Sequence, residues 1–174
     1  MVSVAVSDLG STELVFVQPG AKVDGAYYCS VLLTQHLLPA INWISGGHFI
    51  FQQDSASTHL SQETIALLSW ETPDFIPPWL WPPNSLDLNP VDYHVWSVLE
   101  QWVYRTRIHD VNHLKTRLVE EWQKFDQKII DWAIRQWRLR LRSCIQQEED
   151  TLYSIQTVCQ AKVLCCKLHF SDVL

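Results

Sequence analysis

Hydrophobic and polar positions alternate at the start of the chain and then adopt helical spacing. Valines alternate with small residues between Val2 and Val6, which predicts a β-strand. A turn over residues 7–11 and a second strand over residues 12–17 complete a predicted β-hairpin. Apolar residues at helical spacing then predict a helix that begins at Asp24 or Gly25 and runs up to Pro39.

Short strands and helices alternate through the middle of the chain. Residues 49–53 read as a strand, and Asp54 follows it directly. Ser61 is a suitable N-cap for the next helix, and residues 75–76 form a short strand before a pair of prolines. This order of elements predicts an α/β fold.

Three helices are expected in the second half of the chain. Asn89 caps the first, Pro90 occupies its first position, and its apolar face runs to Val103. The second extends from Asp110 through Trp122, and the third from about residue 127 to residue 146. Residues 147–174 have no clear hydrophobic period.

The composition favours one folded domain and limits the classes of partner that this domain can bind. The chain has 174 residues, 47% of them hydrophobic, and nine tryptophans, enough for one core with large buried rings. Its net charge of −6 argues against a general DNA-binding surface. No signal peptide and no apolar run of about 18 residues is visible, so an intracellular protein without a membrane span is expected.

Two carboxylates stand at the ends of predicted elements, where side chains can converge on one site. Asp54 follows the strand over 49–53, and Asp92 falls in the first turn of the helix that begins near Pro90. Oxygen ligands of this kind suit hard divalent cations.

The residues around both acids resemble the catalytic domain of Tc1/mariner-type transposases. The matching segments are Phe51-Gln52-Gln53-Asp54-Ser55-Ala56 with His59, then Trp81-Pro82-Pro83-Asn84-Ser85, Asp87-Leu88-Asn89-Pro90 and Asp92-Tyr93. The resemblance implies an RNase H-like fold in which three acids hold two Mg²⁺ or Mn²⁺ ions. It implies metal-ligand and catalytic roles for Asp54, matching the second acid, and Asp92, matching the third.

The chain departs from the family pattern within the motifs and at its start. Ser57 and Leu86 stand where the family usually has proline, which leaves the second loop less constrained. The family's first acid and its helix-turn-helix lie upstream of anything that resembles this chain. We therefore expect a partial catalytic domain over residues 1–146 that lacks the first, central strand, followed by a non-family tail over 147–174.

Each site residue also has a structural interpretation. Asp54 could be a strand-end residue that turns the chain, and Asp92 could stabilise a helix start through its dipole; metal binding is compatible with both. His59 and Asn89 are interpreted as local hydrogen-bonding residues, and Asp87 as part of its loop.

Other candidate chemistry favours structural roles. Asp8 lies in a predicted turn, where aspartate is expected, so we do not assign it the place of the missing acid. Cys165-Cys166 with His169 lacks zinc-like pairing at both ends, and ordinary thiols are favoured. The arginines of the last helix have acidic residues close by in sequence, which favours a solvated face over a phosphate-binding one; these acids are Glu120, Glu121, Asp131, Glu148, Glu149 and Asp150.

The resemblance implies metal-dependent cleavage and joining of DNA, with transposon ends as partner, a possible homodimer and a nuclear location. The resemblance implies no small-molecule substrate and no association with a membrane. Because the first acid is missing, we expect this chain to be inactive. The alternatives are a DNA- or protein-interaction module without chemistry, or a relic without a selected function. We also expect strand 2–6 either to pair directly with strand 49–53 or to leave both edges open.

Overall fold

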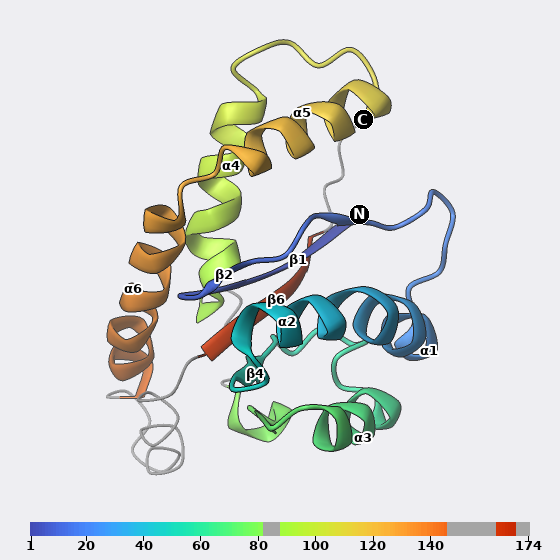
Figure 1. Ribbon diagram of the computed structural model, residues 1–174, viewed down its shortest axis with the longest axis vertical. Helices are drawn as coiled ribbons and strands as arrows, with labels where there is room; N and C mark the ends of the chain where they lie inside the picture. Colours follow the sequence, from blue (N-terminus) through green and yellow to red (C-terminus); the bar gives the residue numbers. More distant parts are fainter. Residues whose placement is uncertain (82–87, 146–162, 170–174) are drawn as a thin grey trace.

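The computed structural model of the protein describes residues 1–81, 88–145 and 163–169. A mixed sheet of six strands lies between two groups of helices, which confirms the α/β prediction (Figure 1). Among the described residues, no helix combines the length and apolar character that crossing a membrane requires.

The first strand, β1 (Val2–Ser7), is buried along its whole length. The short strands β2 (Gly10–Ser11) and β3 (Val15–Phe16) pair antiparallel with it. The predicted second strand is thus interrupted at Thr12, whose Oγ1 accepts the Ala5 N–H at 3.0 Å while its own N–H donates to the Ala5 carbonyl. A side-chain oxygen takes the place of a ladder carbonyl, so the strand divides into two.

The sheet has the order β2-β1-β6-β4-β5. β6 (Val163–His169) lies antiparallel to β1 and parallel to β4 (Ile50–Gln52), and β4 lies parallel to β5 (Asp74–Phe75). The prediction that strand 2–6 would pair directly with strand 49–53, or leave its edge open, is therefore wrong. A segment from the predicted tail supplies the backbone hydrogen bonds that both edges require.

One group of helices contains α1 (Gly25–Tyr27), η1 (Tyr28–Leu37), α2 (Leu38–Ser45) and α3 (Gln62–Glu71). Asp24 caps the first, as predicted, by accepting the Tyr27 N–H. The helical stretch does not end at Pro39 but continues to Ser45. η1 has the wide π-helical turn, and Pro39 stands where this changes to the α-helix α2.

The other group contains η4 (Val91–Val95), α4 (Trp96–Val103), α5 (Val111–Gln123) and α6 (Gln127–Ile145). Asn89 accepts the Val91 N–H at 3.1 Å and Asp110 accepts the His113 N–H at 2.8 Å, so both predicted helix starts are confirmed. Residues 82–87 of the motif loop, including Asp87 and Leu86, lie outside the described residues. A short 3₁₀ turn, η2 (Pro78–Leu80), precedes them.

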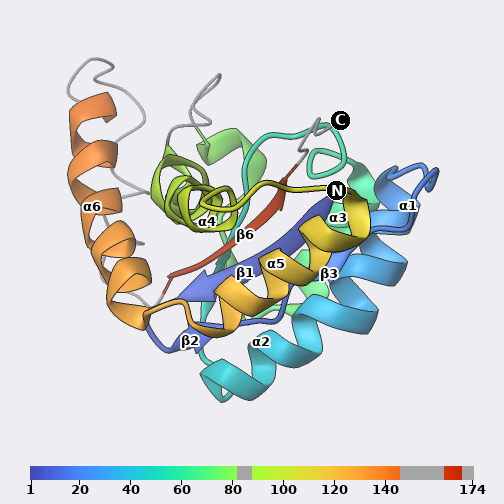
Figure 2. The ribbon, with the colours of Figure 1, turned by 90° about the horizontal axis from the view of Figure 1, so that it is seen from above.

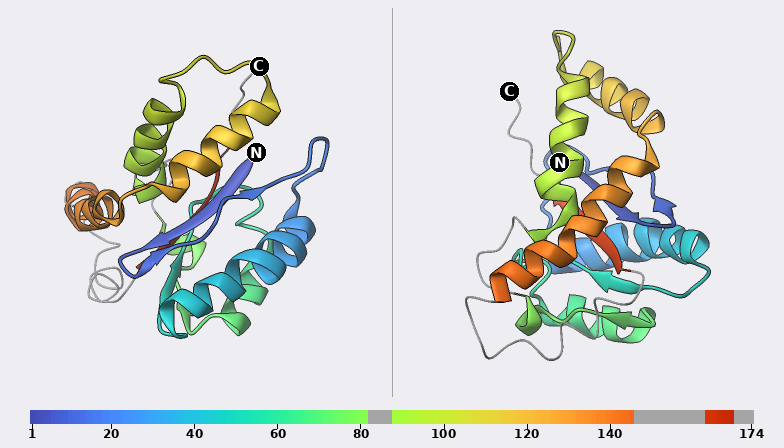
Figure 3. Two further views of the ribbon diagram at one scale, coloured as in Figure 1. Left: turned by 45° about the horizontal axis from the view of Figure 1, so that its top comes forward. Right: turned by 90° about the vertical axis from the view of Figure 1, so that its left-hand side faces the viewer.

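Two hydrophobic cores lie on opposite faces of the sheet. α4, α5 and α6 cover one face, while η1, α2 and α3 cover the other (Figures 2 and 3). Val2, Val4 and Val6 belong to the first core and Ala5 to the second, as the alternation along β1 requires. The sheet is thus enclosed from both sides.

Candidate functional site

Asp54 lies two residues beyond the end of β4, where the sequence places it, but it is almost fully buried. Its exposed fraction is 2%. Its Oδ1 accepts the Ala56 N–H at 3.0 Å, a bond that closes a turn directly after the strand. A short polar side chain that accepts the backbone N–H two residues on is the local requirement for such a turn.

His59 holds the same carboxylate. Its Nδ1 lies 2.6 Å from Asp54 Oδ1 and 3.0 Å from the Asp54 carbonyl oxygen. Both neighbours are acceptors, so Nδ1 carries the proton. The His59 side chain is 1% exposed, and its Nε2 has no hydrogen-bond partner among the described residues. His59 is thus confirmed as a hydrogen-bonding residue.

Two further residues enclose the Asp54–His59 pair. The Tyr28 ring lies 4.7 Å from the His59 ring, centroid to centroid, and its hydroxyl donates to Gln53 Oε1 at 3.0 Å. Gln53 Nε2 in turn donates to the His59 carbonyl at 3.3 Å. Sequence reasoning missed Tyr28, because an aromatic residue within an apolar helical face gives no sign of a polar partner.

Asp92 lies in the first turn of η4, as predicted, and is partly exposed. Its N–H donates to the Asn89 carbonyl at 2.9 Å. Asn89 is fully buried and accepts from Val91, so it too is confirmed as a hydrogen-bonding residue. η4 contacts β6, which pairs with β4, so the elements that carry Asp92 and Asp54 both border β6. That the two carboxylates share one ion stays a prediction.

Side chains of α6 pack on the two residues that follow Asp92. The Arg140 guanidinium of α6 lies 4.0 Å from the centroid of the Tyr93 ring, and the Tyr93 hydroxyl donates to the Ala133 carbonyl. On the same turn, the His94 ring lies 4.3 Å from the Trp132 ring. Burial lowers the pKa of His94, and the nearby positive charge of Arg140 lowers that pKa further.

Three exposed arginines of α6 recur at i, i+3 and i+7 and so form a row along one side of this helix: Arg135, Arg138 and Arg142. Arg140 is also exposed but lies on another side, against the Tyr93 ring. Arg135 bonds only the Asp131 carbonyl of its own helix, through Nε at 3.1 Å.

The described residues supply part of the donor set that the resemblance implies for a metal pair. Among residues 1–81, 88–145 and 163–169, no group of three or more His, Cys, Asp or Glu residues is arranged to hold a metal ion. Asp54 is buried, with one carboxylate oxygen taken by two hydrogen bonds. Two acids of suitable chemistry are present, fewer than the three that the family uses.

Asp8 has no place in this site. It is exposed in the turn between β1 and β2, where Ser7 Oγ donates to the Gly10 carbonyl and accepts the Leu9 N–H. The turn interpretation is therefore supported. Cys165, Cys166 and His169 lie on β6.

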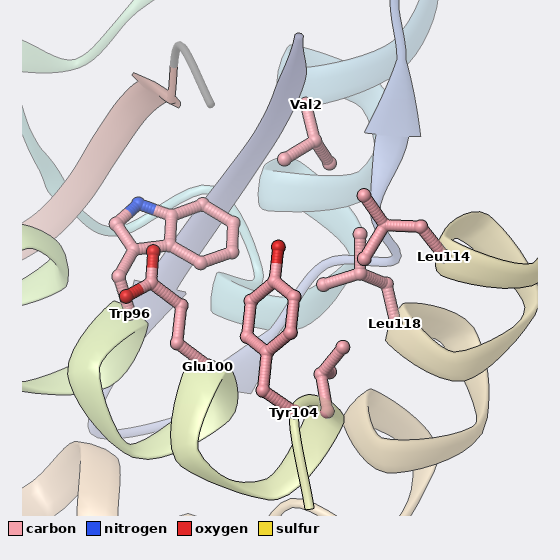
Figure 4. A pocket seen from close by; sticks show the side chains of 7 residues that line it. Val2, Trp96, Glu100, Tyr104, Leu114 and Leu118 are labelled. Atoms are coloured by element: carbon pink, nitrogen blue, oxygen red, sulfur yellow. The ribbon is translucent and has the colours of Figure 1, made fainter. Parts of the chain in front are cut away.

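A small pocket lies elsewhere, between the start of β1, α4 and α5 (Figure 4). Its walls are mainly apolar, and Glu100 and Tyr104 are its polar members. Burial raises the pKa of the Tyr104 hydroxyl, and Glu100 raises it further. The pocket is lined by Val2, Trp96, Glu100, Tyr104, Leu114 and Leu118.

Sequence comparison finds two curated relatives. The Tcb2 transposable-element transposase of Caenorhabditis briggsae is 29% identical over 100 residues, which are 58% of this chain and 35% of the relative. The Tc3 transposase of Caenorhabditis elegans is 27% identical over 150 residues, which are 85% of this chain and 44% of the relative. The chain thus spans less than half the length of either relative. No protein-family model matches the chain.

Structure comparison finds the same fold in a mariner transposase. The catalytic domain of the Mos1 mariner transposase superposes with a TM-score of 0.66 at 22% identity, covering 86% of this chain and 74% of that one. A Mos1 paired-end complex with the left transposon end gives a TM-score of 0.68, also at 22% identity, covering 82% of this chain and 41% of that one. The RNase H-like expectation for the fold is confirmed.

Proposed function

We propose that this chain, which is similar to Tc1/mariner-type transposases in sequence and to the Mos1 catalytic domain in fold, is a transposase catalytic domain by descent and that its partner is DNA. The observation that carries the proposal is Asp54 at the end of β4 together with Asp92 at the start of η4, on this fold. Mos1 structures with a transposon end and in a strand transfer complex support DNA as the partner class.

Divalent metal is the cofactor that this descent implies. Mos1 catalytic-domain structures with Mn and with Mg support metal use by relatives. When bound, such ions activate water and stabilise the leaving oxygen of a phosphodiester. In this chain Asp54 and Asp92 would be two of the protein ligands, and among the described residues no third acid joins them. We therefore propose that the chain does not cleave or join DNA.

Hydrolysis and strand transfer can be measured directly. Purified chain is incubated with supercoiled plasmid and labelled duplex in Mg²⁺ or Mn²⁺, and no nicking or joining above background is expected. Asp54→Ala and Asp92→Ala are the matched controls. Nuclease activity that copurifies with the wild type and disappears in both variants would contradict the proposed inactivity and show that the metal site is complete.

A second candidate is DNA binding without chemistry, and the arginine row on α6 favours it. Arg138 and Arg142 are exposed on the helix that packs against η4. The expected binding is weak and falls steeply with salt, because contacts of arginine with phosphate release counterions. A mobility-shift titration at two salt concentrations tests this, with Arg138→Gln/Arg142→Gln compared against Lys22→Gln on an exposed loop. Equal affinity of the two variants would exclude the row as a DNA contact.

A nuclear location and a homodimer belong to the same proposal. Mos1 structures include paired-end complexes, which supports a homodimer as the assembly to test. Imaging of the tagged chain in cells tests the location, and light scattering of the purified chain with and without DNA tests the dimer. A chain that stays outside the nucleus and remains monomeric with DNA would contradict both.

A further inference from the structure

The central strand position of the sheet, between β1 and β4, is filled by a segment distant in sequence from both. β6 pairs with β1 from Val2↔His169 to Val6↔Cys165 and with β4 from Ile50↔Val163 to Gln52↔Cys165. Among the described residues, no register pair joins β1 to β4 directly. β6 is therefore the only strand that joins the two halves of the described sheet.

The neighbouring chain places few constraints on β6. Residues 146–162 separate it from the end of α6. Fully extended, a connection of that length spans about 55–60 Å, far more than the width of several strands. The position of β6 is thus determined by the edges that it pairs with, as the position of a bound peptide would be.

Both faces of the central strand position are apolar. Of the adjacent strand residues, Val4 and Ile50 belong to the core on one face of the sheet, and Ala5 and Phe51 to the core on the other. A strand between them faces apolar surroundings on both sides, and such strands are nearly continuous hydrophobic runs. Residues 163–168 meet this requirement at every position except Lys167, which lies opposite Val4 in the register.

We propose that the central strand position is a peptide-binding site, filled by residues 163–169 of the same molecule and able to accept a separate peptide of that sequence. The required ligand is an extended segment of about seven residues that is apolar on both faces. It must run antiparallel to β1 and parallel to β4, because only that direction satisfies both edges in the observed register.

The first test is a cross-strand disulfide in the full chain. Ala5 lies opposite Cys166, whereas Ser3 lies opposite Leu168. Opposed Cα atoms in an antiparallel pair are about 4.5–5.5 Å apart, within disulfide range. With the other four cysteines replaced by serine, mild oxidation of Ala5→Cys is expected to give an intramolecular bond, and the matched Ser3→Cys variant none. Equal oxidation of the two variants, or disulfide-linked dimers from Ala5→Cys, would overturn binding within one molecule.

The second test opens the site. Cys166→Pro removes an N–H from the middle of β6, whereas the control Cys166→Val keeps it. A labelled peptide of residues 162–169 is expected to bind Cys166→Pro at least ten-fold more tightly than wild type or Cys166→Val, measured by fluorescence anisotropy. The same peptide with the Cys166→Pro change should not bind.

If Cys166→Pro aggregates, its refolding in the presence of the peptide is measured instead. Dilution from denaturant with the unmodified peptide is then expected to recover soluble monomer, and dilution with the proline peptide is not. The proposal is overturned if Cys166→Pro is as stable as Cys166→Val, with unchanged amide protection in β1 and β4. It is also overturned if the peptide neither binds nor rescues the variant.

Discussion

Replacing Asp54 with alanine is expected to lower the free energy of unfolding of the metal-free protein by about 2–4 kcal/mol. The Asp54 carboxylate accepts from the Ala56 N–H and from His59 Nδ1 at 2% exposure. Hydrogen bonds to a charged group contribute about 1.5–3 kcal/mol each, but His59 keeps the Asp54 carbonyl as an acceptor. The loss is therefore less than two full bonds, yet large against a total stability of about 5–15 kcal/mol.

Two control variants separate the hydrogen bonds from the charge. Asp54→Asn keeps an acceptor oxygen at the same place, so a loss of about 1 kcal/mol or less is expected. Asp8→Ala removes an exposed carboxylate and is expected to change stability by at most about 0.5 kcal/mol. Wild type, Asp8→Ala and Asp54→Asn should therefore have similar free energies of unfolding. The free energy of unfolding of Asp54→Ala should be clearly lower.

Urea unfolding in the presence of EDTA, followed by circular dichroism, measures these differences, provided that the slope with denaturant is unchanged. If Asp54 were held among repelling acids for metal, its removal would relieve repulsion and stabilise the metal-free protein. Asp54→Ala equal to or more stable than wild type would therefore refute the structural role given to the Asp54–His59 pair.

The remaining predictions concern the cores and the His94–Arg140 pair. Leu33→Ala, at a fully buried position, should lower the free energy of unfolding by about 2–5 kcal/mol in urea, and a loss below 1 kcal/mol would contradict its burial. Gly25→Ala should cost about 1–3 kcal/mol, because its Cβ would lie 2.5 Å from Ser61 Oγ; in the same assay Ser61→Gly should relieve part of the cost, and additive losses would exclude that clash. Arg140→Gln should raise the pKa of His94 in an NMR titration, while burial keeps that pKa below its usual value; an unchanged pKa would show that Arg140 has no influence. Because the pKa of His94 is lowered on folding, its contribution to stability is present above pH 6.5 and is lost as the pH falls through its folded pKa, which urea unfolding across that range can follow.

Local chemistry explains which parts of the fold the sequence predicted. Ser61 and Asp110 cap α3 and α5 because each side chain needs only a backbone N–H three residues on. Asp54 follows its strand as predicted, because alternation and the turn residues are all nearby. Each of these features depends on fewer than about ten consecutive residues.

Features that depend on distant residues were not predictable in the same way. β6 lies in the sheet because β1 and β4 each offer it an edge of backbone hydrogen-bonding groups. The sequence of residues 163–169 does not indicate which strands these residues pair with. Pro39 lies within a continuous helical stretch because the preceding turn is widened, a choice that local propensity does not reveal. The enclosure of the Asp54–His59 pair depends on Tyr28, whose ring reaches His59 from η1.

The position of β6 has a consequence for the order in which the chain is made. β1 is synthesised before its partner β6, and most of the described chain lies between them. At about 5–20 residues per second, β1 waits roughly 10–30 s for this partner. During that interval its unpaired backbone N–H and C=O groups are available to chaperones, to strands of neighbouring nascent chains and to aggregation. Faster elongation, or fewer chains per messenger, should therefore raise the soluble yield of this protein.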